Sequence, residues 1–162
     1  MRKAIGMTTM LLLLALPARA AQETIVSGGV TGLFPGGTTF SGVSLSALEG
    51  GFGLEIENGT ALGEIYVALL GTSVAGTQQT ITLTGKATAG AQTATSTATF
   101  SGTVSLDLGT GVAPTTVPFT ATVVVGADDR GTLGLVIGTT TLPNATIDTG
   151  SMTVSVPPTV TP

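Results

Sequence analysis

Hydrophobic and polar side chains alternate with a period of two along most of the chain, and helical periodicity is nearly absent beyond the N-terminal segment. The clearest run is 93–107, in which the odd positions are polar and the even positions are mostly apolar. A half-buried strand presents its two faces in this way. A straight strand over this range would extend about 50 Å, so we expect a bend or bulge near Gly102, where no side chain hinders it.

Shorter runs with the same period predict further strands, each with an inward apolar row. These rows comprise Phe52, Leu54 and Ile56; Ile81 and Leu83; Val117, Phe119, Ala121, Val123 and Val125; and Leu133, Leu135 and Ile137. Residues 62–70 are apolar on both faces apart from Glu64 and Tyr66, so they predict a central strand. The apolar positions change parity after Ile147, which predicts a bulge near Thr149-Gly150.

Turn-forming residues separate these runs. Asn58-Gly59 is the strongest short hairpin signal, and Asp128-Asp129-Arg130-Gly131 offers a glycine for positive φ. Pro35-Gly36-Gly37 and the stretch 109–114 predict loops. About nine short strands at roughly ten-residue spacing predict an all-β fold. We expect an antiparallel β-sandwich of the jelly-roll or immunoglobulin-like kind, or a small barrel.

Several short segments recur in the same order, which suggests an internal duplication. The matched pairs are 39–45 with 99–106, 59–63 with 131–134, 71–72 with 138–139, and 84–88 with 149–153. The candidate half-repeats are 38–97 and 98–156. A duplication would place two similar sheets face to face about a pseudo-two-fold axis, and the alternative is chance similarity in a chain rich in Gly and Thr.

The N-terminus has the three parts of a signal peptide in their usual order. Arg2 and Lys3 are basic, Met10 to Leu16 is an apolar run, and Ala18-Arg19-Ala20 offers small residues for cleavage before Ala21. The apolar run is shorter than the ~20 residues that span a bilayer, which disfavours the alternative of an uncleaved anchor.

Cleavage of the signal peptide at 1–20 would leave a single all-β domain at 21–156 and a Pro-rich C-terminal tail at 157–162. We expect the protein to be secreted, in the periplasm, outside the cell or on the cell surface. The lack of cysteine in an exported chain favours a bacterial source over an animal one.

The amino-acid composition limits the classes of partner that the protein is expected to bind. Only 9% of the residues are charged, and Thr, Gly, Ala and Val dominate. Beyond the signal peptide only Lys86 and Arg130 are basic, against nine carboxylates, which gives a net charge of about −7. Because phosphate binding needs clustered cations, we expect no nucleic-acid partner. We expect no integral membrane segment after cleavage, and a partner that is a protein, either a second copy or a surface protein.

Catalytic side chains are scarce. The chain has no His and no Cys, which excludes Ser-His-Asp and Cys-His catalysis and zinc sites built from those ligands. Glu55 and Glu57 share one strand face about 7 Å apart, a spacing compatible with a paired-carboxylate mechanism. Sites that cleave sugars also use aromatic platforms, and the chain has one Tyr and no Trp. We expect a solvated strand face here, assign no catalytic residue and expect no enzyme.

Metal and cofactor sites are not expected either. Asp128, Asp129 and Asp107 offer oxygen ligands for calcium, but no spaced Asp-x-Asp-x-Asp loop is present. Two adjacent aspartates before Arg-Gly are typical of a turn, in which their side chains cap backbone N–H groups. We therefore assign no metal-binding and no cofactor-binding residue.

The threonine row is a further candidate surface. Thr93, Thr95, Thr97 and Thr99 lie about 7 Å apart on one strand face, a spacing that orders surface water in ice-binding proteins. Such surfaces need several stacked rows, and no other segment repeats this one in register. An outer-membrane barrel would fit the alternation, but five Phe and one Tyr cannot form two aromatic girdles.

These observations predict an exported, non-enzymatic β-sandwich that serves as a bacterial surface, matrix or interaction module. One alternative is a subunit of an extracellular fibre or pilus assembled by strand exchange, with 21–31 as the exchanged arm. The other alternative is a carbohydrate-binding or carboxylate-dependent hydrolytic module.

Overall fold

The computed structural model describes residues 23–157. All regular secondary structure in that range is β-strand, so the predicted all-β class is confirmed. Within the same range no helix is long and apolar enough to cross a membrane. The predicted signal peptide at 1–20 and residues 158–162 of the predicted tail lie outside the described residues.

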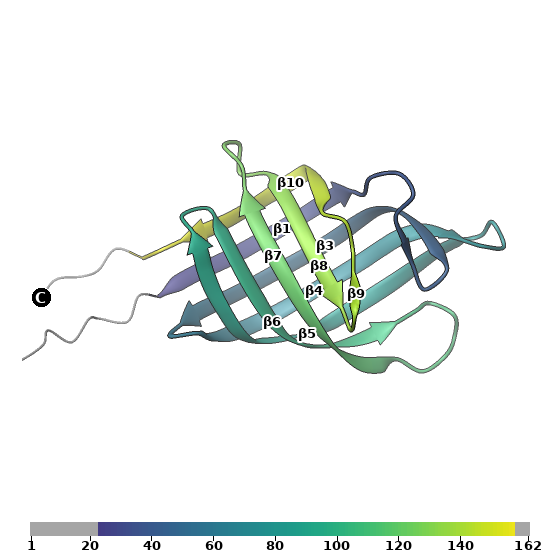
Figure 1. Ribbon diagram of the computed structural model, residues 1–162, viewed down its shortest axis with the longest axis horizontal. Coiled ribbons are helices and arrows are strands. Elements are labelled where there is room, and N and C mark those ends of the chain that lie inside the picture. Colours follow the sequence, from purple (N-terminus) through teal and green to yellow (C-terminus); the bar gives the residue numbers. More distant parts are fainter. Residues whose placement is uncertain (1–22, 158–162) are drawn as a thin grey trace, which may run out of the picture.

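Ten strands follow one another along the chain and pair antiparallel (Figure 1). Their bounds are β1 Thr24–Leu33, β2 Thr39–Phe40, β3 Val43–Glu57, β4 Thr60–Ser73, β5 Gln78–Ala94, β6 Thr97–Asp107, β7 Thr115–Val125, β8 Gly131–Ile137, β9 Thr140–Thr141 and β10 Ala145–Ser155. β2 and β9 have two residues each, and the longer strands form the body of the sheet.

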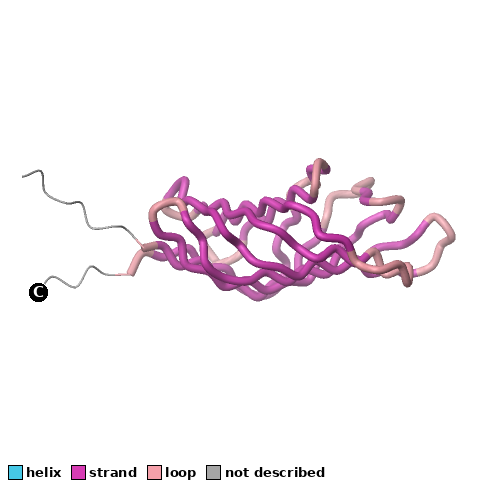
Figure 2. Tube along the Cα trace, turned by 90° about the horizontal axis from the view of Figure 1, so that it is seen from below, coloured by secondary structure: helices cyan, strands magenta, loops and turns pink. Residues whose placement is uncertain are grey.

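The pairing path returns to its starting strand. From β3 to β8 each long strand pairs with the next along the chain, and β8 pairs with β10. β1 pairs with β3 from Thr24 to Leu33 and with β10 from Ile25 to Leu33. The start of β1 and the end of β10 lie side by side at one end of the molecule (Figure 1). The strands wrap an elongated body with long loops at the other end (Figure 2).

The inward side of this sheet is a continuous apolar core. Every predicted inward row supplies buried side chains, with Phe100 among the largest that are fully buried. Its ring centroid lies 5.8 Å from that of Phe52 and 6.2 Å from that of Phe119, tilted in the first pair and edge-on in the second. Aromatic pairs at these distances stabilise a core beyond the area they bury. The period-two alternation therefore predicted the buried face correctly.

β4 differs in part from its prediction. It lies between β3 and β5 in the pairing order, as a central strand should. Its outer face is nevertheless open, because Leu62 is 71% exposed and Tyr66 is 48% exposed. Ala68 on the same face is buried, but it is not part of the core cluster, and nothing within residues 23–157 covers Leu62 and Tyr66 as a second layer would.

The predicted strand over 93–107 is interrupted. β5 ends at Ala94, and a turn at Thr95-Ser96 precedes β6. The expected irregularity near Gly102 is present, but the extra residue belongs to the partner strand, where Thr88 is skipped opposite Ser101 and Gly102. The sequence did not reveal the turn because hydroxyl side chains continue through it without a break in alternation.

Other local predictions are confirmed. Asn58 and Gly59 have φ values of +51° and +82°, which a two-residue hairpin between β3 and β4 requires. In β10 the pairing with β1 jumps from Thr149 to Ile147, so Asp148 is bulged next to the predicted position.

The matched segments of the candidate duplication have partly different surroundings. Residues 39–45 contain a turn at Ser41-Gly42, whereas 99–106 lie inside the uninterrupted strand β6. In the first half a single strand, β3, joins segment 39–45 to the hairpin at 59–63. In the second half the chain passes through two strands, β6 and β7, before it reaches the matching hairpin at 131–134. The half-repeats 38–97 and 98–156 therefore stay a prediction.

Among the pairings that connect β1, β3 to β8 and β10 in a closed cycle, the one between β8 and β10 is the shortest. Only Ala145 and Thr146 of β10 pair with β8. Beyond them the β7–β8 hairpin turn lies against β10: the Met152 N–H donates to the Asp129 carbonyl at 2.7 Å, and Arg130 Nη1 donates to the Asp148 carbonyl at 2.8 Å. A turn thus covers a strand edge that would otherwise be open to pairing with another chain.

Substitution of Arg130 tests whether the β7–β8 turn protects the edge of β10. In Arg130→Ala we expect faster hydrogen exchange at the Met152 amide, with a loss of at most about 1 kcal/mol in global stability because the contacts are exposed. Lys86→Ala is the control, since the Lys86–Glu64 pair is 4.0 Å long and solvated. Unchanged exchange at Met152 in Arg130→Ala would contradict the role of the turn.

Two glycines test the assignment of inner and outer faces. A Cβ at Gly102 would lie 2.0 Å from the Lys86 carbonyl oxygen, so we expect Gly102→Ala to lower the free energy of unfolding by about 1–3 kcal/mol. Nothing lies within 4 Å of a Cβ at Gly53, so Gly53→Ala should lose nothing and gain up to about 1 kcal/mol. Urea denaturation measures both values, and equal effects would show the faces to be misassigned.

Candidate functional site

The space enclosed by the sheet is filled by side chains. Phe52, Phe100 and Phe119 occupy its middle. At one end Thr24 Oγ1 donates to Gln92 Oε1 at 3.1 Å, and both residues line a groove of about 210 Å³ at that end of the sheet. At the other end the β1–β2 connection buries Phe34 and Thr38, with further apolar residues packed around them. Candidate binding surfaces must therefore be sought mainly on the outer face.

The outer face of β3 and β4 combines glutamates, glycines and one tyrosine. Along β3 the outward positions are Glu49, Gly51, Gly53, Glu55 and Glu57, and along β4 they include Leu62, Glu64 and Tyr66. Strand register sets their neighbours, because Gly51 pairs with Tyr66 on one side and with Gly29 on the other. Gly53 likewise pairs with Glu64, which pairs with Lys86 of β5.

Two grooves of about 400 Å³ each meet at Tyr66. The first, here called the Lys86 groove, is lined by Gly51, Gly53, Glu64, Tyr66, Thr84 and Lys86 together with the backbone between them. The second, the Thr31 groove, is lined by Gly29, Thr31, Glu49, Gly50, Tyr66 and Thr149 and their neighbours. The chain's single tyrosine is therefore the shared wall of both grooves.

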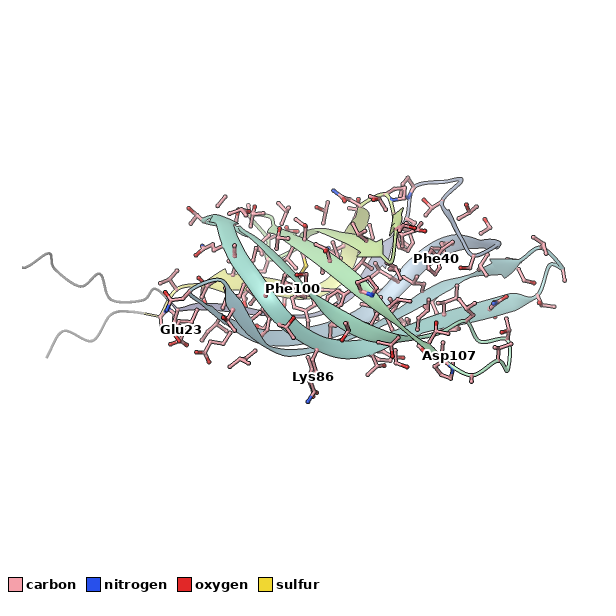
Figure 3. All side chains as sticks on the ribbon, turned by 60° about the horizontal axis from the view of Figure 1, so that its bottom comes forward. Glu23, Phe40, Lys86, Phe100 and Asp107 are labelled. Atoms are coloured by element: carbon pink, nitrogen blue, oxygen red, sulfur yellow. The ribbon has the colours of Figure 1, made fainter. Side chains whose placement is uncertain are left out.

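The charged residues at the Lys86 groove are well solvated. Lys86 Nζ lies 4.0 Å from Glu64 Oε1, with side chains 77% and 79% exposed, so this ion pair contributes little to stability. Figure 3 shows the Lys86 side chain projecting away from the sheet. Both groups remain available to contact a ligand at the groove rim.

The predicted carboxylate pair lies on one exposed face, as the alternation indicated. Glu55 and Glu57 line a groove of about 270 Å³ with Asn58, Thr60 and Leu62. Both side chains are exposed, and no aromatic residue lines this groove. Burial is the usual means by which a carboxyl group is made a general acid, so the surroundings of this pair do not favour such a role.

The structure separates the three aspartates considered for calcium. Asp107 ends β6 beside the start of β7, whereas Asp128 and Asp129 follow the far end of β7. Asp107 Oδ1 accepts from the Gly109 N–H at 2.8 Å, and Asp128 Oδ2 lies 2.9 Å from Arg130 Nε. In residues 23–157 no group of three metal-ligating side chains comes together. Asp107 thus caps a turn, and Asp128 pairs with Arg130 in the turn between β7 and β8.

The four threonines predicted to form one row on a single strand lie on two strands and the turn between them. Thr93 is the next-to-last residue of β5 and Thr95 lies in the turn, so of these four residues only Thr97 and Thr99 belong to β6. The hydroxyl of Thr99 lies 3.1 Å from that of Thr122 on β7, and both residues are partly buried. The pairing of hydroxyl rows on β6 and β7 is visible only once the register is known, because it depends on the length of the loop between them.

Sequence reasoning missed the Tyr66 surface. Its members come from separate strands, and the glycines among them look the same in sequence as those that packing requires. No family model, curated protein or solved structure matches this chain. The function proposed below therefore rests on the sequence and the structure of this chain alone.

Proposed function

We propose that this chain is an exported, non-enzymatic binding module, in which a closed antiparallel sheet presents its outer surface to a partner. The observation that carries the proposal is the division of the sheet into a filled apolar interior and an outer face that bears the grooves and nearly all polar side chains. A site for a small ligand would normally occupy a concave, enclosed space, and side chains take up that space here.

The pairing of β1 with both β3 and β10 supports a small barrel over a sandwich as the finer description of the fold. A sandwich has two sheets whose edge strands each lack a partner on one side. A barrel removes such edges by closure, which suits a protein that must remain unaggregated outside the cell. Export itself rests on the N-terminal charge and apolar pattern described above.

The strand-exchange alternative is less well supported. Within the described residues, 24–31 of the segment that would be the exchanged arm belong to β1, which already lies between β3 and β10 of its own chain. Its side chains Val26 and Val30 are buried in the same core as the rest. An ordinary first strand folded into its own domain accounts for these contacts.

The proposal is tested by expressing the full chain in a bacterium and analysing the processed product. We expect a mature N-terminus at Ala21 in the periplasmic or extracellular fraction, read by mass spectrometry. We also expect no hydrolysis of ester, peptide or polysaccharide substrates. Retention of residues 1–20 in the cytoplasm would overturn export, and turnover lost in both Glu55→Gln and Glu57→Gln would overturn the non-enzymatic assignment.

A further inference from the structure

The glycines on the outer face near Tyr66 are not explained by the fold. A Cβ at Gly29 or Gly53 would have nothing within 4 Å, and one at Gly51 would meet only a carbonyl oxygen at 3.7 Å. None of the three has a positive φ. By contrast, a Cβ at Gly85 or Gly102 would collide with the neighbouring strand. Glycine weakens a strand, and where packing does not require it, it often marks the close approach of a ligand.

The bare backbone at these glycines forms the floor of a continuous surface on both sides of Tyr66. The Thr31 groove runs from β10 over β1 and β3, and the Lys86 groove continues over β3 and β4 to β5. Strand spacing makes this path about 19 Å long, which is the length of a short oligosaccharide. Tyr66 of β4 is 48% exposed and lines both parts of this path, with its ring accessible to a ligand.

The side chains that line the two grooves indicate which class of ligand would bind there. An aromatic ring beside a flat peptide floor matches the C–H face of a sugar ring, and hydroxyls and carboxylates at the rim match its hydroxyl groups. Thr31, Thr84 and Thr149 supply hydroxyls, while Glu49 and Glu64 supply acceptors. Two carboxylates against the single cation Lys86 disfavour nucleic acids and acidic glycans.

A second copy of the chain fits this surface less well. A two-fold contact on the face would bring the glutamates of β3 and β4 opposite those of the partner. Like charges placed opposite each other oppose association. An uncharged ligand avoids this repulsion and still uses the ring, the floor and the hydroxyls.

We propose that the two grooves flanking Tyr66 together bind an uncharged glycan chain, with the Tyr66 ring against a sugar face and Glu49 and Glu64 accepting hydrogen bonds from its hydroxyl groups. This inference rests on the proposed function and names the class of partner. Because Gly29, Gly51 and Gly53 have no side chain, the bound glycan can lie directly on the protein backbone at these positions.

The test uses the processed protein on an array of neutral glycans that includes β-1,3-glucan, β-1,4-glucan and N-acetylglucosamine oligomers, followed by calorimetry with the best binder. We expect Tyr66→Ala and Gly53→Val each to weaken binding by about tenfold or more, since one removes the ring and the other fills the floor. Tyr66→Phe should stay within about threefold of the parent chain, because the ring is kept.

Leu62→Ala is the matched control, because Leu62 is an exposed apolar residue of the same strand that lines neither groove. Thermal melting confirms that each variant is folded. Absence of binding to every neutral glycan, binding to heparin or polygalacturonate alone, or binding unchanged in both Tyr66→Ala and Gly53→Val would overturn the glycan site while leaving the binding-module proposal intact. Release of reducing sugar from the probes would instead overturn the non-enzymatic assignment.

Discussion

The structure depends on the insertion of β1 between β3 and β10. Backbone hydrogen bonds on both sides of this one strand convert an open meander with two long edges into a closed sheet. Unpaired strand edges recruit other chains, so closure both completes the core and protects it. β8 pairs with only two residues of β10. Beyond them the turn that contains Asp129 and Arg130 hydrogen-bonds to β10 and covers its edge.

Closure also divides the side chains into two environments with different demands. Inside, each residue must pack, which explains why glycines such as Gly85 and Gly102 stand where a neighbouring strand comes too close for a Cβ. Outside, packing sets few limits, so an unusual choice of residue there calls for another explanation. The three open glycines beside Tyr66 are such a choice, and they connect the architecture to the proposed binding surface.

Much of the fold could be predicted from the sequence, because period-two alternation and turn residues are local signals. The rows Ile81–Leu83 and Leu133–Ile137 are buried as predicted, and the parity change after Ile147 does mark a bulge. The break at Thr95-Ser96 was missed, since polar alternation continues through it. The Tyr66 surface was missed for a deeper reason: Gly29, Gly51 and Tyr66 become neighbours only through strand register, which no local pattern encodes.

The most direct measurement of closure by β1 is a cross-strand disulfide. Ser27 and Thr153 are directly paired across β1 and β10, with hydroxyl oxygens 2.8 Å apart, so the variant Ser27→Cys/Thr153→Cys places two cysteines at adjacent positions whose side chains approach each other. Oxidation of the purified double variant should give a disulfide-linked monomer on non-reducing gels, while Ser27→Cys/Thr116→Cys should remain reduced. Disulfide-linked dimers and longer ladders, or two free thiols in the first variant, would show that β1 does not pair with β10 of its own chain.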